Sequence, residues 1–187
     1  PDNAFGVQNN PVFTYSLVNT FGGRFAISGN SIVVANSALF DFETGPNTFA
    51  LQVRSNDNAG GSITETVNVN VSNVNEAPTL PSLSVAAFSE AAASGTTIGQ
   101  LSATDPEDGT AVRFSLIDDA NGRFAIVKTA AGYELRVAEN LLIDHQANPG
   151  GDAAHTYNVQ VQAIDSAGLA SVRTIAVTAN GAIENRV

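Results

Sequence analysis

The chain has 187 residues, 43% of them hydrophobic, which is enough for a packed core and excludes wholesale disorder. Eighteen acidic residues against eight basic ones give a formal net charge of −10, which argues against binding to nucleic acid or to anionic membrane surfaces. Cysteine is absent, which excludes disulfides, thiolate metal sites and a cysteine nucleophile. No apolar run is long enough for a membrane-spanning helix.

An internal repeat organises the sequence. The matched segments are, in order, residues 15–17 with 114–116, 23–27 with 122–126, 48–49 with 156–157, and 57–60 with 165–168. Matches that keep one order indicate two copies of one domain, which we place at residues 1–74 and 75–187. Arg24 and Arg123 recur at one position of the repeat, and we interpret them as strand-edge charges.

Alternation of apolar and polar residues predicts β-strands in each copy. At residues 157–163 the apolar side chains of Tyr157, Val159, Val161 and Ala163 alternate with polar ones. This period of two is typical of half-buried strands with one face in a core. Gly, Asn and Pro clusters separate such runs, and no long helical period occurs. The pattern predicts one β-sandwich per copy, of about 100 residues each.

The two copies differ at their starts. The second copy has a lead-in at residues 80–105 that includes a first strand, whereas the first copy opens on the counterpart of Pro106. We therefore expect the first domain to lack its N-terminal strand, either because the chain is a fragment of a longer array or because the strand is supplied from elsewhere. A sandwich without an edge strand exposes unpaired backbone groups. Residues 179–187, or a lost N-terminal piece, would donate a strand and give head-to-tail filaments.

Six short motifs carry a family resemblance. They are Ser-Glu at residues 89–90, Ala-Thr-Asp-Pro-Glu at 103–107, Gly-Arg-Phe-Ala-Ile at 122–126, Asp-Phe-Glu at 41–43, Ala-Ile-Asp-Ser-Ala-Gly at 163–168 and Asn-Val-Asn-Glu-Ala-Pro at 73–78. In these motifs the chain resembles bacterial cadherin-like tandem repeats, as in calcium-binding adhesins of the RTX-adhesin type. The resemblance implies an all-β chain of two tandem cadherin-like, Ig-like Greek-key β-sandwich domains. It also implies that Ca²⁺ binds between consecutive domains.

The resemblance assigns a set of calcium ligands to this sequence. The first copy and its linker contribute Asp41, Glu43, Asn73, Asn75 and Glu76, and the second copy contributes Asp105, Glu107 and Asp165, with Asp108 as a substitute for Glu107. Ca²⁺ takes six to eight oxygen ligands of this kind. Asp41 and Glu43 lie two residues apart, so in an extended segment they would share one face. Crowded carboxylates repel one another, so we expect a linker that is loose without Ca²⁺ and stiff with it. Asn73 and Glu76 stand where the family usually has Asp, which predicts a weaker affinity.

No enzyme signature accompanies these motifs. Ser166 follows Asp165, but no Gly-x-Ser-x-Gly elbow surrounds it, and the two histidines lack a partner cluster with ligand spacing. We interpret the chain as a non-enzymatic, calcium-dependent adhesion or structural module outside the cell, at a bacterial surface. Its partner would be a second copy, or a protein or polysaccharide of another cell or matrix. Alternatives are a calcium-dependent exopolysaccharide-binding module, a strand-exchanged filament subunit, and a passive spacer in a larger secreted enzyme.

Overall fold

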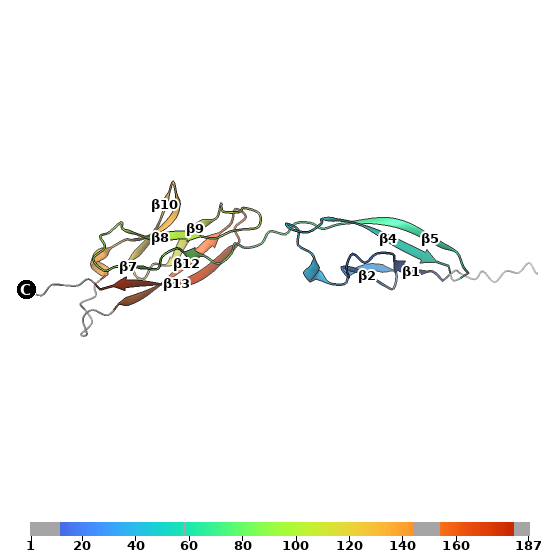
Figure 1. Cartoon of the computed structure of the whole chain (residues 1–187), viewed down its shortest axis with the longest axis horizontal. Helices are drawn as coiled ribbons and strands as arrows, with labels where there is room; N and C mark the ends of the chain where they lie inside the picture. The colour runs from blue at the N-terminus through green and yellow to red at the C-terminus, as the bar shows by residue number, and fades with distance from the viewer. Residues whose placement is uncertain (1–11, 58, 144–153, 182–187) are drawn as a thin grey trace, which may run out of the picture. The chain divides into compact units, whose positions relative to one another are not determined.

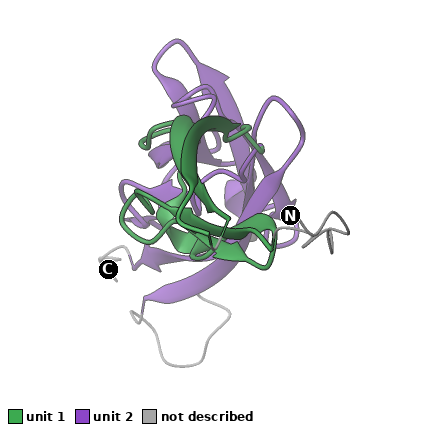
Figure 2. Ribbon diagram, turned by 90° about the vertical axis from the view of Figure 1, so that its right-hand side faces the viewer, with its two compact units in different colours: residues 1–74 green, residues 75–187 purple. Residues whose placement is uncertain are grey.

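The computed structural model describes residues 12–57, 59–143 and 154–181 and divides into two compact units, residues 1–74 and 75–187 (Figure 2). The regular structure of the described residues is β-strand, with two short 3₁₀ turns and no α-helix. The expectation of an all-β chain is therefore confirmed. No helix in this part of the chain is long and apolar enough to cross a membrane.

The second unit is a sandwich of two four-stranded sheets (Figure 1). Its elements are β6 (Ser82–Leu83), β7 (Ala87–Ser89), β8 (Thr97–Ser102), β9 (Arg113–Asp118), β10 (Phe124–Thr129), β11 (Gly132–Val137), η2 (Asn140–Leu142), β12 (His155–Ile164) and β13 (Ala170–Asn180). One sheet has the order β7-β13-β12-β9, and the other has the order β10-β11-β8-β6. The chain crosses between the sheets after each of β6, β7, β8, β9 and β11, which is the connectivity of a Greek-key sandwich.

The core of the second unit lies between these sheets. Val159 and Val161 of β12 are fully buried, whereas Gln160 between them is exposed. On the facing sheet, Leu135 and Val137 of β11 are buried in the same cluster. Apolar and polar residues alternate along these strands because successive side chains of a strand point to opposite faces, and only one face packs against the other sheet.

The outer face of the second sheet carries a polar network around Glu134 of β11. Its carboxylate accepts hydrogen bonds from Thr97 (2.8 Å), Gln100 (2.9 Å) and Arg136 (2.7 and 2.9 Å). Thr97 and Gln100 belong to β8, so the network joins two neighbouring strands. The bonds from Arg136 and Thr97 lower the pKa of Glu134 below its ordinary value, because they favour the ionised carboxylate.

The first unit is a smaller sandwich built on the same strand order. Its elements are β1 (Thr14–Leu17), β2 (Phe25–Ser28), β3 (Ser31–Val34), η1 (Ser37–Leu39), β4 (Thr48–Asn56) and β5 (Ser62–Asn70). β1, β4 and β5 form one sheet, and β2 and β3 form the other. Its buried cluster is Phe25, Phe49 and Leu51, which Phe21 and Phe40 extend through edge-to-face ring contacts.

The described residues of the first unit include no counterpart of β6, β7 or β8. As a result, the outer edges of β3 and β5 pair with no other strand of the described chain. The expected donor segment begins at Ala179, which is buried in β13 beside β7, and residues 182–187 of that segment lie outside the described residues.

A repeated arginine closes the same turn in both units. Three consecutive left-handed residues precede it, and its guanidinium donates back to the first of them: Arg24 to the carbonyl of Phe21 (2.8 Å) and Arg123 to that of Ala120 (2.7 Å). Arg123 also lies over the Tyr157 ring, with 5.2 Å from guanidinium carbon to centroid. The arginines therefore do more than we expected of strand-edge charges, since they hold a turn and cover a core ring.

Candidate metal centre

Asp165 is the most buried acidic residue among the candidate ligands, with 1% of its surface exposed. It follows β12, and Oδ1 accepts hydrogen bonds from the backbone N–H groups of Gly168 and Leu169. Gly168 has a φ of 99°, a conformation that favours glycine. Oδ2 accepts a hydrogen bond of 2.6 Å from the side-chain amide of Asn75. The bond from Asn75, and after it the bonds from the loop backbone, lower the pKa of Asp165 and keep it ionised.

Asp105 lies in a neighbouring turn and is 5% exposed. Its backbone forms an isolated bridge with Gly109, and Oδ1 accepts hydrogen bonds from the N–H groups of Glu107 (3.0 Å) and Asp108 (2.8 Å). Oδ2 is buried and has no hydrogen-bond partner among the described residues. A buried carboxylate oxygen in this state is costly. A bound cation would satisfy it.

Asp108 joins the two turns that carry Asp105 and Asp165. Its oxygens accept hydrogen bonds from the backbone N–H (2.5 Å) and the hydroxyl (3.0 Å) of Ser166. Each carboxylate oxygen of Asp108 accepts one of these hydrogen bonds, so this residue fixes the Asp105 turn against the Asp165 turn. The sequence reasoning missed this role because Asp108 and Ser166 are 58 residues apart and share no local pattern.

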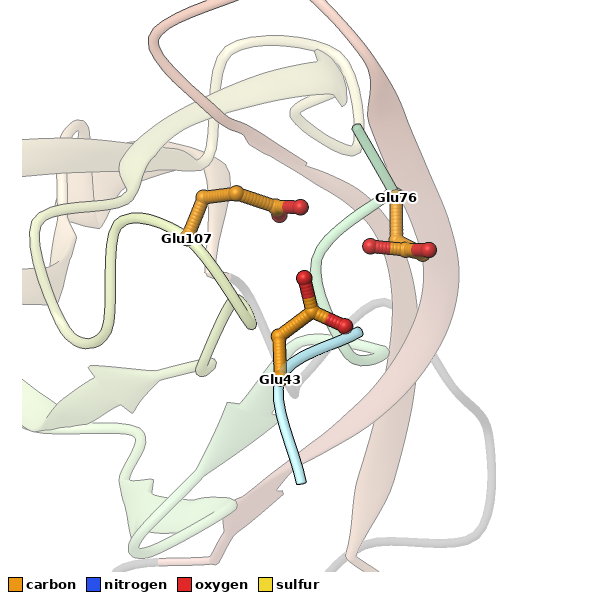
Figure 3. A group of neighbouring side chains, drawn as sticks. All are labelled: Glu43, Glu76 and Glu107. Atoms are coloured by element: carbon orange, nitrogen blue, oxygen red, sulfur yellow. The ribbon is translucent and has the colours of Figure 1, made fainter. Parts of the chain in front are cut away.

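Glu76 and Glu107 add two exposed carboxylates to the second unit. Carboxylate oxygens of the two residues lie within 4.8 Å of each other (Figure 3). Glu76 belongs to the segment that enters the unit, and Glu107 belongs to the turn between Asp105 and Gly109. Two carboxylates at this spacing repel each other, and a divalent cation between them would remove the repulsion.

The ligands expected from the first unit lie in a turn. Oδ1 of Asp41 accepts hydrogen bonds from the N–H groups of Glu43 and Thr44 (both 3.0 Å), and Oδ2 accepts one of 2.6 Å from the Thr44 hydroxyl. The expectation of an extended segment was therefore wrong, because Asp41 folds residues 42–44 into a turn. Gly45 completes it: a Cβ atom there would lie 2.5 Å from the carbonyl oxygen of Asp41. The Thr44 bonds lower the pKa of Asp41.

Two further candidate residues of the first unit complete the list. Glu43 and Asn73 are exposed, the former in the Asp41 turn and the latter in the segment that follows β5. Asp57 follows β4 as Asp165 follows β12, and its Oδ1 likewise accepts two hydrogen bonds from the backbone of the next turn, here from the N–H groups of Ala59 and Gly61 (both 2.8 Å). The repeat therefore includes the acidic turn as well as the strands.

Comparison with known proteins found similarity in structure alone. No family model and no curated protein matches the chain. Human protocadherin-24 EC1-2 superposes with a TM-score of 0.62 at 17% sequence identity, covering 95% of this chain and 84% of that one. Drosophila N-cadherin EC1-4 gives a TM-score of 0.57 at 21% identity, covering 91% and 41%. The protocadherin gammaB7 EC3-6 cis-dimer structure gives a TM-score of 0.55 at 24% sequence identity, and the match covers 94% of this chain and 41% of that one.

These similarities establish the fold. The chain spans 26–41% of the longer cadherin fragments that it matches, for example 41% of PcdhgB3 EC1-4 and 26% of the protocadherin gammaB4 extracellular domain. Together with the sheet orders of the two units, they show that the chain has the all-β, cadherin-like sandwich fold.

Proposed function

We propose that the chain is a calcium-dependent adhesion or structural module that works outside the cell. In this proposal Ca²⁺ binds at the linker between the units, and the ligands are the eight residues that the sequence predicts, Asp41, Glu43, Asn73, Asn75, Glu76, Asp105, Glu107 and Asp165. The unsatisfied, buried Oδ2 of Asp105 is the observation that carries the proposal.

The donor set of the second unit fits a hard cation. Every candidate ligand offers oxygen, which is what Ca²⁺ prefers, and neither sulfur nor imidazole is among them. Hydrogen bonds hold Asp105 and Asp165 in place without using all of their oxygen capacity. Asp108 fixes the two turns against each other through Ser166, so two ligand-bearing loops are oriented before a cation arrives. Such orientation lowers the entropic cost of binding.

The proposed mechanism is mechanical. A cation coordinated by residues of both units would restrict the motion of one unit relative to the other. The stiffened chain would then present its adhesive surface in an extended form. The cadherin-like fold supports this role, and the motif resemblance supports a location at a bacterial surface. The partner would be a second copy of the chain, or a protein or polysaccharide on another cell or in a matrix.

Calcium-dependent stiffening is testable in solution. Dyes placed on the two units, at exposed positions away from the candidate ligands, report the width of the distance distribution by single-molecule energy transfer. We expect a narrow distribution in millimolar Ca²⁺ and a broad one in chelator, with Glu43→Ala broad in both. Equal widths in Ca²⁺ and chelator would contradict the proposal. A glycan array with and without Ca²⁺ then distinguishes a polysaccharide partner from a protein partner.

A further inference from the structure

One outer sheet face has the same composition in both units. It consists of the alternate, outward-facing residues of 48–52 and 66–70 on β4 and β5, and of 156–160 and 174–178 on β12 and β13; we call each set an amide face (Figure 1). Every residue of the two amide faces is Thr, Asn, Gln or Ala, and none is charged, in a chain of net charge −10. Their side chains point away from the core and are exposed or half-buried, so core packing does not select them.

One cross-strand pair shows that the composition of the whole face is repeated, and not that of a single strand. Ala50 of β4 pairs with Asn68 of β5, and at the equivalent place Asn158 of β12 pairs with Ala176 of β13. The two residue types have exchanged strands, yet the pair is the same. Ala and Asn are both depleted in β-strands, so strand propensity does not explain their place in these long strands.

The side-chain amides of the two faces are available to a ligand. Those of Gln52 and Asn68 in the first unit, and of Asn158 and Gln160 in the second, form no hydrogen bond with the residues that the structure describes. Each amide group offers both donors and an acceptor. The pleat of the strands presents these groups at regular intervals on one side of the sheet.

Charge and size restrict what an amide face binds. Arg54 borders the first face and Asp118 borders the second, and no ionised group lies within either. Each face measures roughly 17 Å by 10 Å from ordinary strand spacings, or about 170 Å². A stable protein–protein interface buries about 800 Å² on each partner and is enriched in aromatic and arginine anchors, which these faces lack. An uncharged chain of hydroxyl-bearing sugars needs neither.

We propose that the amide faces bind a neutral polysaccharide through hydrogen bonds between the free amides and sugar hydroxyl groups. The proposal rests on the adhesion role given above and narrows its partner to one chemical class. Each hydrogen bond contributes little net free energy, so a single face binds weakly. A polysaccharide presents the same groups many times, so two faces on one chain raise the overall affinity. Binding does not depend on Ca²⁺, since no proposed calcium ligand lies on an amide face.

Affinity electrophoresis of the full chain, in native gels that contain dextran, mannan or galactan and a chelator, tests the proposal. Mobility is compared with that in gels without polysaccharide, and the anionic polysaccharide alginate serves as the charge control. We expect at least one neutral polysaccharide to retard the chain and alginate not to. Its dependence on polysaccharide concentration gives Kd.

Paired substitutions make the test specific. Ala50→Glu with Ala176→Glu places a charge in the middle of both faces and should raise Kd at least tenfold. Asn30→Glu with Ala131→Glu is the matched control, because it adds the same charge at exposed positions in the turns of the β2–β3 and β10–β11 hairpins. The control should leave Kd unchanged.

A milder pair guards against loss of folding in the charged variant. Gln52→Ala with Gln160→Ala removes one free amide from each face without added bulk and should raise Kd about fivefold.

Several outcomes would overturn the proposal. These are no retardation by any of the three neutral polysaccharides, equal effects of the charged variant and its control, or an unchanged Kd in the glutamine variant. Self-association without polysaccharide, seen by sedimentation and abolished by Ala50→Glu with Ala176→Glu, would assign the faces to a second copy and overturn it as well. Because the gels contain chelator and energy transfer measures calcium-dependent stiffening separately, failure of this proposal is distinguishable from failure of the proposed calcium role.

Discussion

Replacing Asp105 with asparagine separates the structural role of this side chain from its proposed role in cation binding. Oδ1 accepts two backbone hydrogen bonds, and the Asp105→Asn variant keeps an oxygen in that position. Oδ2 is buried and accepts no hydrogen bond from the residues that the structure describes, and the substitution replaces it with an uncharged amide nitrogen. The turn should therefore persist while the cation ligand is lost.

The expected effect differs between the two solution conditions. In chelator the substitution removes a buried charge but leaves an amide nitrogen at the same place, so we expect stability to change by no more than about 1 kcal/mol. At a Ca²⁺ concentration 100 times Kd, cation binding raises the free energy of unfolding of the parent chain by about 2.7 kcal/mol. The variant should lack this stabilisation. For a unit of this size that difference corresponds to roughly 10 °C in Tm.

Thermal unfolding in chelator and in millimolar Ca²⁺ measures both quantities, with Glu65→Gln as an exposed carboxylate control outside the candidate site. The parent chain and the control should show the same rise in Tm with Ca²⁺, and Asp105→Asn should show little. If Asp105→Asn loses as much stability in chelator as in Ca²⁺, the carboxylate serves only the turn and the reasoning is refuted.

Three further substitutions test other parts of the structure. Asp108→Ala removes both hydrogen bonds to Ser166 and should lower Ca²⁺ affinity about tenfold by calorimetric titration; unchanged affinity would contradict a positioning role. Gly45→Ala forces a Cβ against the carbonyl oxygen of Asp41 and should destabilise the first unit by about 1–3 kcal/mol in urea unfolding. A urea midpoint equal to that of the parent chain would contradict this. The depressed pKa of Glu134 contributes stability that is present above its ordinary value of 4.5 and is lost as pH falls through the lower folded value. Glu134→Gln should therefore flatten the acid limb of the stability curve, and an unchanged slope between the two proteins would count against the network.

Local sequence patterns were sufficient for the fold class. The alternation at residues 157–163 predicts a strand, and β12 spans it with Val159 and Val161 in the core. The repeated segments at residues 23–27 and 122–126 begin β2 and β10, two strands that hold the same place in their sheets. These inferences succeed because strand alternation and turn composition are properties of neighbouring residues.

Expectations that depended on loop geometry were less accurate than those about strands. Asp41 and Glu43 were expected on one face of an extended segment, but the Asp41 carboxylate binds the next backbone N–H groups and folds a turn. A short acidic motif does not reveal whether its side chains bind backbone or solvent. In the same way, Arg24 looked like an edge charge, and only the structure shows its bond to the Phe21 carbonyl.

The sequence by itself determined that this is an all-β chain of two copies of one pattern, rich in acidic loops. Only the tertiary structure decided that Asp108 binds Ser166 across 58 residues and that, within the described part of the chain, Oδ2 of Asp105 is buried without a hydrogen-bond partner. The physical reason is that alternation and turn propensity act between neighbours along the chain. Burial, edge pairing and hydrogen bonding between loops depend instead on which distant segments the folded sheets bring together.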